Sequence, residues 1–159
     1  MFRMNKLTDY GVVLLTRFAQ HPELPVSARE LAEETHLPLP TVGKVLKLLV
    51  RDGILVSHRG TKGGYALARE PREVTVAAII SALEGPVSLT ECQAPGVCGM
   101  ERGCPTKANW QVVNRAILAA LSKLTLLDMT RPLAPSGFPF SRPALPAAAP
   151  RPTHRSPVP

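Results

Sequence analysis

The chain has 159 residues, of which 45% are hydrophobic and 19% are charged, enough for one domain of ordinary size with a buried core. A net charge of +7 favours polyanionic partners, with nucleic acid first. The sequence shows no uninterrupted apolar run of about 18 residues and no secretory signal pattern, so we expect a cytoplasmic protein without a membrane span.

The first part of the chain is expected to hold two helices. Residues 5–20 place apolar side chains at helical spacing, and Asp9 lies near the start, where the helix dipole favours a carboxylate. The prolines of "HPELP" then interrupt the chain, because proline cannot continue a helix. Residues 27–35 begin with Ser27, a good N-cap, and Glu30 completes a capping box.

The segment "TVGKVLKLLVRDG" is predicted to form a third helix, which Gly53 ends. One apolar stripe runs along it, formed by Val42, Val45, Leu46 and Leu49. Two short helices joined by a tight turn match a helix-turn-helix, whose second helix reads DNA. "ILVSHRGTKGGYALAR" then predicts two strands around a glycine-containing loop. The expected fold class is mostly α with a small β-hairpin wing, a winged helix-turn-helix.

A short helix over residues 75–84 and a long helix over residues 106–129 are predicted next. The long helix repeats an apolar residue every three or four positions, at Trp110, Val113, Ile117, Leu121 and Leu124. Such a helix could pack on its own domain or pair with its copy in a homodimer. We favour the homodimer, because palindromic operators suit two-fold proteins.

The last part of the chain changes in composition. From Pro132 onward nine of 28 residues are proline, which predicts a disordered tail. Its arginines leave a weak phosphate-attracting arm as the alternative. The expected organisation is a winged-helix domain over 1–84, a cysteine loop over 85–105, a dimerisation helix over 106–130 and a tail over 131–159.

DNA contacts are expected from the third helix and the wing. A lysine can donate to guanine, and a threonine can contact the thymine methyl group. Gly43 costs about 1 kcal/mol of helix propensity, which suggests that close approach matters there. Any single cation could equally be a solvated surface charge, but the order of helix, turn, helix and basic wing is more specific. The candidate DNA-binding residues are Ser27, Thr41, Gly43, Lys44, Lys47, Arg51, Arg59, Thr61 and Lys62.

All three cysteines of the chain, Cys92, Cys98 and Cys104, lie in "ECQAPGVCGMERGCP", each separated from the next by five residues. This spacing does not place thiols on one helical face, and the glycines and prolines indicate a loop. Pro105 is a good first helical residue, so the helix dipole would favour the Cys104 thiolate. An iron–sulfur cluster, a zinc ion with a further ligand, and structural or redox thiols all fit, and ligand softness favours the cluster.

The chain resembles the winged-helix regulators of the IscR and NsrR type over about residues 1–130. The resemblance rests on "LTDYGVVLL", "SARELAEETHLPLPTVGKVLKLLVRDGIL", "RGTKGGYALAR" and the three cysteines. "KLTDYG", and "CP" followed by "NW", resemble most closely the branch that regulates the SUF pathway of iron–sulfur cluster assembly.

The resemblance implies a homodimeric transcriptional regulator that binds a double-stranded DNA operator and senses an iron–sulfur cluster, expected to be 2Fe–2S rather than 4Fe–4S. A thiol-, redox- or nitric-oxide-responsive repressor of the same fold without a stable cluster is the alternative. We expect neither an enzyme nor a small-molecule substrate, because no phosphate-cradling glycine motif or catalytic Ser–His–Asp order is present.

The resemblance also implies a fourth cluster ligand. In IscR-like members it is a histidine three residues after the last cysteine, where this chain has Lys107, whose protonated amine has no lone pair to give. In NsrR-like members an aspartate near the amino terminus is donated by the other subunit, and Asp9 resembles it in position. Asp9 could equally be a helix-terminus charge. Glu91 and Glu101, nearer in sequence, are alternatives.

Overall fold

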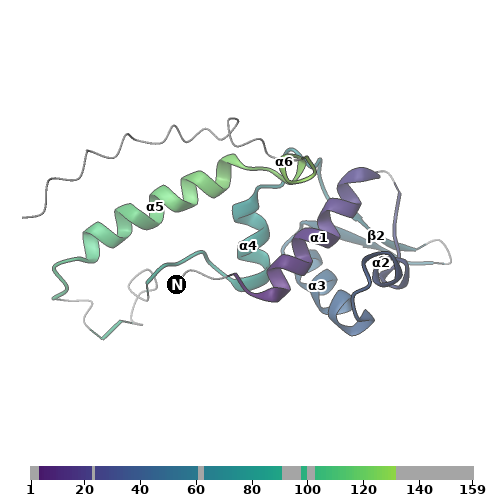
Figure 1. The fold of residues 1–159 in the computed structure, drawn as a ribbon, viewed down its shortest axis with the longest axis horizontal. Helices are drawn as coiled ribbons and strands as arrows, with labels where there is room; N and C mark the ends of the chain where they lie inside the picture. Colours follow the sequence, from purple (N-terminus) through teal and green to yellow (C-terminus); the bar gives the residue numbers. More distant parts are fainter. Residues whose placement is uncertain (1–3, 23, 61–62, 91–97, 100–102, 132–159) are drawn as a thin grey trace, which may run out of the picture.

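A computed structural model describes residues 4–22, 24–60, 63–90, 98–99 and 103–131 (Figure 1). Six helices and one hairpin confirm the predicted fold class of mostly α structure with a small wing. Within the described residues, every helix is too short or too polar to cross a bilayer. The elements are α1 (Lys6–Gln20), α2 (Ala28–Thr35), α3 (Leu39–Arg51), β1 (Leu55–His58), β2 (Gly64–Leu67), α4 (Val76–Glu84), α5 (Lys107–Lys123) and α6 (Leu126–Met129).

The helix boundaries follow local sequence signals. Asn5 caps α1 by accepting a hydrogen bond from the main-chain nitrogen of Leu7. His36 ends α2 in the left-handed region at φ +54°, which allows the sharp turn into α3. Gly53 follows α3 at φ +69°, a conformation that favours glycine, so the predicted end of this helix is confirmed within one or two residues.

One hydrophobic core joins α1, α2, α3, α4 and the short α6. Its centre contains side chains without solvent exposure from each of these layers, among them Leu14, Leu31, Leu46, Ile79 and Leu126. A fully buried leucine of this kind contributes roughly 1.5–3 kcal/mol to stability. The core therefore fixes the position of α3, whose other side is left toward solvent.

The wing consists of β1 and β2, which pair antiparallel with Ser57 opposite Tyr65. Val26 extends this pairing, because its main-chain nitrogen and oxygen both bond to the main chain of Tyr65 at 2.9 Å. A Cβ atom at Gly63 would lie 2.4 Å from the main-chain oxygen of His58, and one at Gly64 would lie 2.7 Å from that of Val26. The two adjacent glycines of the wing are therefore required by close backbone contacts.

The predicted long helix over 106–129 is wrong at its carboxyl end, because α5 ends at Lys123 and a separate helix, α6, follows. Leu124 is extended, and its main-chain oxygen accepts a bond from the nitrogen of Val76 at 2.8 Å. Thr125 and Asp128 then form a capping box that starts α6. This break turns Leu126 into the core, where it has no exposed surface.

Within the described residues, the apolar contacts of α5 with the cluster on α4 come from its carboxyl-terminal half. Ile117, Leu118, Leu121 and Leu124 lie against a small cluster formed by α4 and Val87. The amino-terminal half extends past α4 (Figure 1), and Trp110 and Val113 are each 42% exposed. Packing on its own domain thus accounts for three of the five residues of the predicted stripe. Pairing with a second copy stays a prediction for Trp110 and Val113, and the predicted tail lies outside the described residues.

Candidate nucleic-acid interface and cysteine loop

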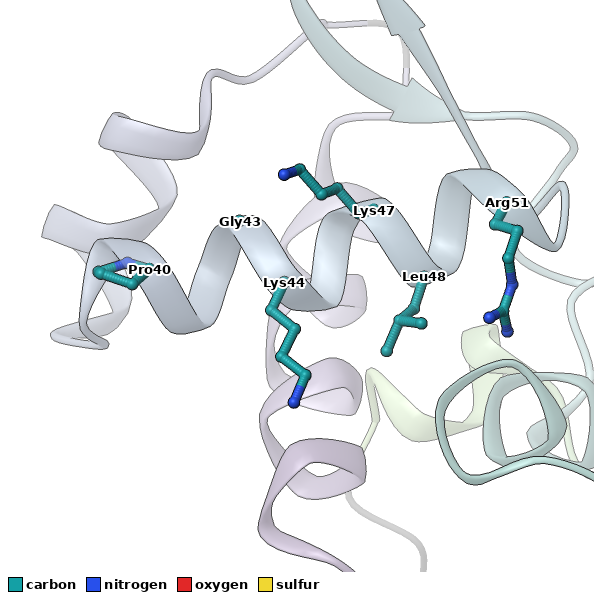
Figure 2. Close-up of a pocket in the computed structure, with 6 residues that line it drawn as sticks. All are labelled: Pro40, Gly43, Lys44, Lys47, Leu48 and Arg51. Carbon is teal, nitrogen blue, oxygen red and sulfur yellow. The ribbon is translucent and has the colours of Figure 1, made fainter.

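Helix α3 has two faces of different chemistry. The predicted apolar stripe is buried in the core. On the other face, residues three or four positions apart line an open groove of about 520 Å³. Figure 2 shows the lining side chains, which are Pro40, Gly43, Lys44, Lys47, Leu48 and Arg51. With three cations along it, this groove suits a polyanion.

Gly43 lines the groove, and a Cβ atom added there would meet nothing within 4 Å. The fold therefore does not require glycine at this position, although glycine costs about 1 kcal/mol of helix stability relative to alanine. The missing side chain lets an external partner come close to the α3 backbone. This supports Gly43 as a residue that serves binding rather than folding.

The three cations of the groove are not equivalent. Lys44 and Lys47 are exposed, and their amines extend away from the helix (Figure 2). Arg51 instead donates from Nε to Asp52 Oδ1 at 2.7 Å and from Nη2 to the main-chain oxygen of Ala82 at 3.3 Å. The sequence predicted Arg51 as a DNA-binding residue, but it did not predict its bond to α4.

Two predicted DNA-binding residues carry hydroxyl groups at the starts of helices. Ser27 Oγ accepts a bond from the nitrogen of Glu30 at 3.2 Å, and the Glu30 carboxylate accepts one from the nitrogen of Ser27 at 2.8 Å. The predicted capping box is confirmed, so Ser27 serves the fold of α2. Thr41 lies half-buried in the first turn of α3. DNA contacts by either residue stay predictions.

The wing supplies one further described cation. Arg59 is exposed beside Gly60, whose φ of +119° favours glycine. Thr61 and Lys62, also predicted to bind DNA, lie outside the described residues. The described part of the wing thus presents a positive charge on a tight turn, a geometry that suits a groove edge or a phosphate.

A second hollow, of about 280 Å³, lies between α3 and the wing. It is lined by Lys47, Val50, Arg51, Ser57 and Tyr65. Sequence reasoning missed Ser57 and Tyr65, although the two-residue period of strands could have found them, because residues directly opposite each other in a hairpin share one face. Hydroxyl groups beside cations are frequent donors to DNA phosphates.

The cysteine loop is described only in part. Cys98 and Cys104 are both half-buried free thiols, whereas Cys92 lies outside the described residues. Among the residues that the structure describes, no three His, Cys, Asp or Glu side chains come together as a metal site. The structure therefore does not bring Asp9 together with both described cysteines within one chain.

Cys104 has the environment expected of a ligating thiol. The Thr106 side-chain hydroxyl, 3.4 Å from its sulfur, lowers the pKa of the Cys104 thiol most, with help from the main-chain groups of Thr106 and Lys107. Cys104 lies three residues before Lys107, the first residue of α5, so the prediction that Pro105 is the first residue of this helix is wrong. Thiolates are the soft ligands that iron–sulfur clusters and zinc take, so the donor present fits such a group.

Asn114 anchors the start of the cysteine loop to α5. Its amide nitrogen donates to the main-chain oxygen of Val87 at 3.3 Å, and its oxygen accepts from the nitrogen of Leu89 at 3.2 Å. Asn114 is only 5% exposed. Sequence reasoning missed it; the available signal was a polar residue between Trp110 and Ile117 on the apolar face of the helix. Both ends of the loop are therefore attached to α5.

Asp9 is exposed in the first turn of α1. The start of α1 is held by Glu84, the last residue of α4, whose carboxylate accepts bonds from the main-chain nitrogen of Asn5 at 2.8 Å and from the Thr8 hydroxyl at 2.5 Å. Thr8 is fully buried. The turn that carries Asp9 is thus fixed next to the segment that leads into the cysteine loop.

The chain is similar to known transcriptional regulators over most of its length. A family model, Rrf2, described as an iron-dependent transcriptional regulator, matches residues 4–132. The repressor NsrR of Streptomyces coelicolor is 29% identical over 137 residues, which cover 85% of this chain and 91% of that protein. The regulator IscR of Serratia proteamaculans is 28% identical over 128 residues, covering 80% and 78%.

Solved structures of two regulators have a similar fold. IscR of T. potens shares 34% sequence identity and superposes with a TM-score of 0.61, covering 80% of this chain and 85% of that one. CymR, a global cysteine regulator of B. subtilis, shares 27% identity with a TM-score of 0.62, covering 82% and 97%. The range matched by the family model, residues 4–132, includes the helix-turn-helix, the hairpin and the helix after the cysteine loop.

Proposed function

Since the chain belongs to the Rrf2 family of DNA-binding transcriptional regulators, and is not an enzyme, we propose that it senses an iron–sulfur cluster through its cysteine loop. It would act as a cytoplasmic homodimer on operators of SUF-type iron–sulfur assembly genes. The observation that carries this proposal is the pairing of a cationic α3 groove with a loop whose described end holds a thiolate-favouring cysteine.

Different residues of the α3 groove would contact different parts of the DNA. Lys44, near the start of the helix, can reach guanine acceptors in the major groove. Lys47 lies one turn further on, where a cation suits a phosphate. Gly43 between the first turn and these cations lets the helix backbone lie near the bases. The exposed Arg59 of the wing would add a contact outside the groove.

The cysteine loop supports ligation by Cys92, Cys98 and Cys104. A bound iron–sulfur cluster supplies iron–thiolate bonds that are gained and lost with iron supply and redox conditions. This chain's own part is to present thiolates: Thr106 stabilises that of Cys104, and Asn114 holds the opposite end of the loop on α5. The cluster type proposed is 2Fe–2S.

A second copy of the chain would complete the site. The exposed Trp110 and Val113 offer an apolar surface for a partner helix. We propose that Asp9 of the partner subunit is the fourth ligand, since it is exposed on a turn fixed next to the loop. A chain that sediments as a monomer at all accessible concentrations would contradict this arrangement.

Anaerobic purification with a visible spectrum and iron and sulfide analysis tests cluster binding. We expect a coloured protein whose absorption or stability changes in Asp9→Ala and stays the same in Glu33→Ala, an exposed carboxylate on α2. An unchanged Asp9→Ala spectrum removes Asp9 from the site. A colourless, iron-free protein after anaerobic reconstitution would defeat cluster sensing altogether.

Selection of duplexes from a random-sequence pool tests DNA reading. Lys44→Ala should weaken binding to the selected duplex more than to random DNA, by about 1–3 kcal/mol if a base contact is lost. An equal loss on both would make Lys44 a phosphate contact. Lys123→Ala, an exposed cation at the end of α5, serves as the control for charge alone.

A thiol-responsive repressor without a stable cluster is the second candidate. The lowered pKa of the Cys104 thiol favours it, because a thiolate reacts faster with oxidants than a thiol does. The similarity to CymR points in the same direction. The cluster experiment separates the two candidates, since this one predicts a colourless protein whose DNA binding changes on reversible thiol oxidation.

A further inference from the structure

The guanidinium of Arg51 connects the groove on α3 with the end of α4, the helix that precedes the cysteine loop. It lies in the last turn of α3, at the edge of the DNA-facing groove. Its Nη2 donates to the main-chain oxygen of Ala82 in the last turn of α4, at 3.3 Å. The side chain is still 64% exposed, so the same group also faces solvent.

The contact with α4 has a clear physical reason. The last carbonyl groups of a helix have no partner within that helix, and the helix dipole favours a cation beside them. Helix α4 has no basic residue in its own last turn, and Arg51 of α3 provides the charge instead. Gly85 then ends α4 at φ +91° with its nitrogen bonded to Ser81. Arg51 therefore acts as a cap for α4 supplied by another helix.

The end of α4 leads directly into the cysteine loop. Two residues after Ala82, Glu84 holds the start of α1. Three residues further, Val87 begins the segment that Asn114 binds to α5. A displacement at Ala82 would thus act on a stretch that bonds to α1 at Glu84 and to α5 at Val87, at the start of the loop.

Arg51 also retains the means to bind DNA. A planar guanidinium has more N–H donors than Asp52 and Ala82 use, and such donors match the oxygens of a phosphate. Lys47, one turn earlier, lines both hollows that Arg51 lines. One rigid planar group can therefore hold a phosphate on one side and α4 on the other, which a lysine cannot do.

We propose that Arg51 is a positioning residue that couples DNA binding to the cysteine loop, by joining a DNA phosphate to the end of α4. The inference rests on the proposed DNA binding but not on a bound cluster. Coupling between two sites is reciprocal in equilibrium free energy, so if the state of the loop changes DNA affinity, bound DNA must shift the equilibrium between the states of the loop.

The test measures alkylation of Cys98 and Cys104 by iodoacetamide in the reduced, metal-free full chain, with and without a saturating duplex selected by the wild-type protein. Saturation is set by titration for each variant, so a lower affinity does not disguise the result. We expect the duplex to slow alkylation about fivefold in the wild type, because a coupling of the usual size would lower the population of the reactive loop state by that factor. In Arg51→Lys, which keeps the charge but loses the planar fork, the ratio should fall to near one.

Lys47→Gln is the matched control, because it removes a neighbouring cation that does not contact α4 in any described bond, and it should keep the wild-type ratio. Circular dichroism verifies folding, and Arg51→Gln replaces Arg51→Lys if the latter unfolds. A wild type that binds the duplex with no change in alkylation overturns the coupling and leaves DNA binding intact. A wild-type ratio in Arg51→Lys overturns the role of Arg51. Failure of the wild type to bind any duplex overturns the proposed function, and this inference with it.

Discussion

The molecule contains two regions that are built differently: a head, comprising α1 to α4, the wing and α6, and an arm, comprising α5 with residues 103–106. Every longer helix of the head buries apolar side chains in one shared core. Of the 17 residues of α5, only Asn114 is buried, and it is polar. The head is therefore held by a core of its own, whereas the arm leaves Trp110, Val112 and Val113 largely exposed.

This difference fits the division of function proposed for the two regions. A reader of DNA has to hold α3 rigidly, which the head's core does. A sensor has to change its contacts when its ligand comes or goes, which needs a region of lower local stability. The arm has few buried contacts of its own and carries Cys104 at its start. Substitutions in the head and in the arm should therefore differ in their effect on the free energy of unfolding.

The largest effect is expected in the core of the head. Leu46→Ala removes a side chain with no exposed surface and should lower the free energy of unfolding by about 2–5 kcal/mol. Val112→Ala on the arm, at 56% exposure and on the side of α5 away from the Trp110 stripe, should change it by less than about 0.5 kcal/mol. Chemical denaturation measures both. A similar loss in the two variants would show that the arm is as tightly packed as the head.

Removing the contact between the cysteine loop and α5 should have an intermediate effect on the free energy of unfolding. Asn114→Ala leaves the nitrogen of Leu89 and the oxygen of Val87 without their partner, which costs about 1–3 kcal/mol. Hydrogen exchange of the Leu89 amide should accelerate, because the bond to Asn114 protects it. Asn109→Ala, an exposed residue on the same helix, is the control. Equal exchange in both variants would mean that the loop is held by other contacts.

Much of the head could be predicted because its signals are local. A capping box involves residues three positions apart, and an apolar stripe repeats within one helix, so Ser27 with Glu30 and the buried face of α3 followed from the sequence. The hairpin followed from strand residues on either side of a glycine-rich loop. Each of these patterns is complete within a short segment.

The missed features depend on contacts between distant segments. The break between α5 and α6 is caused by backbone pairing with residues near Thr75, about 50 positions earlier, which an apolar repeat does not reveal. Arg51 and Ala82, 31 positions apart, meet only because α3 packs on α4. The roles of the predicted DNA-binding and cluster residues depend on partners outside the chain, so contacts within one chain do not reveal them.

Alanine substitutions at two helical glycines of the head should change the free energy of unfolding in opposite directions. Gly43→Ala should raise the free energy of unfolding by up to about 1 kcal/mol, since it gains helix propensity and meets nothing. Gly11→Ala should lower it, because its Cβ atom would lie 2.3 Å from Leu83 Cδ1, and overpacking costs about 1–3 kcal/mol. Thermal melting measures both.

The Gly43→Ala variant also distinguishes an effect on DNA binding from an effect on stability. Gly43→Ala should weaken binding to the selected duplex despite its higher stability, because the added methyl group lies on the groove. Unchanged binding would mean that the duplex does not approach α3 closely at this position. A stabilised Gly11→Ala would instead mean that Leu83 can move aside and that the contact between α1 and α4 is looser than it is here.

The smallest effect concerns α6, which follows the arm in sequence but packs in the head. The Thr125 hydroxyl and main-chain nitrogen hold the pKa of Asp128 below its ordinary value of about 3.9. A carboxylate with a lowered folded-state pKa stabilises the protein above its unfolded-state pKa, and this contribution is lost as the pH falls through the folded-state value. Asp128→Asn should therefore melt below the wild type at pH 6, and the difference should vanish as the pH falls through the lowered folded-state pKa. Because Leu126 is part of the head's core, the shift should appear in the main cooperative transition. A shift confined to a separate, earlier transition would assign α6 to the arm.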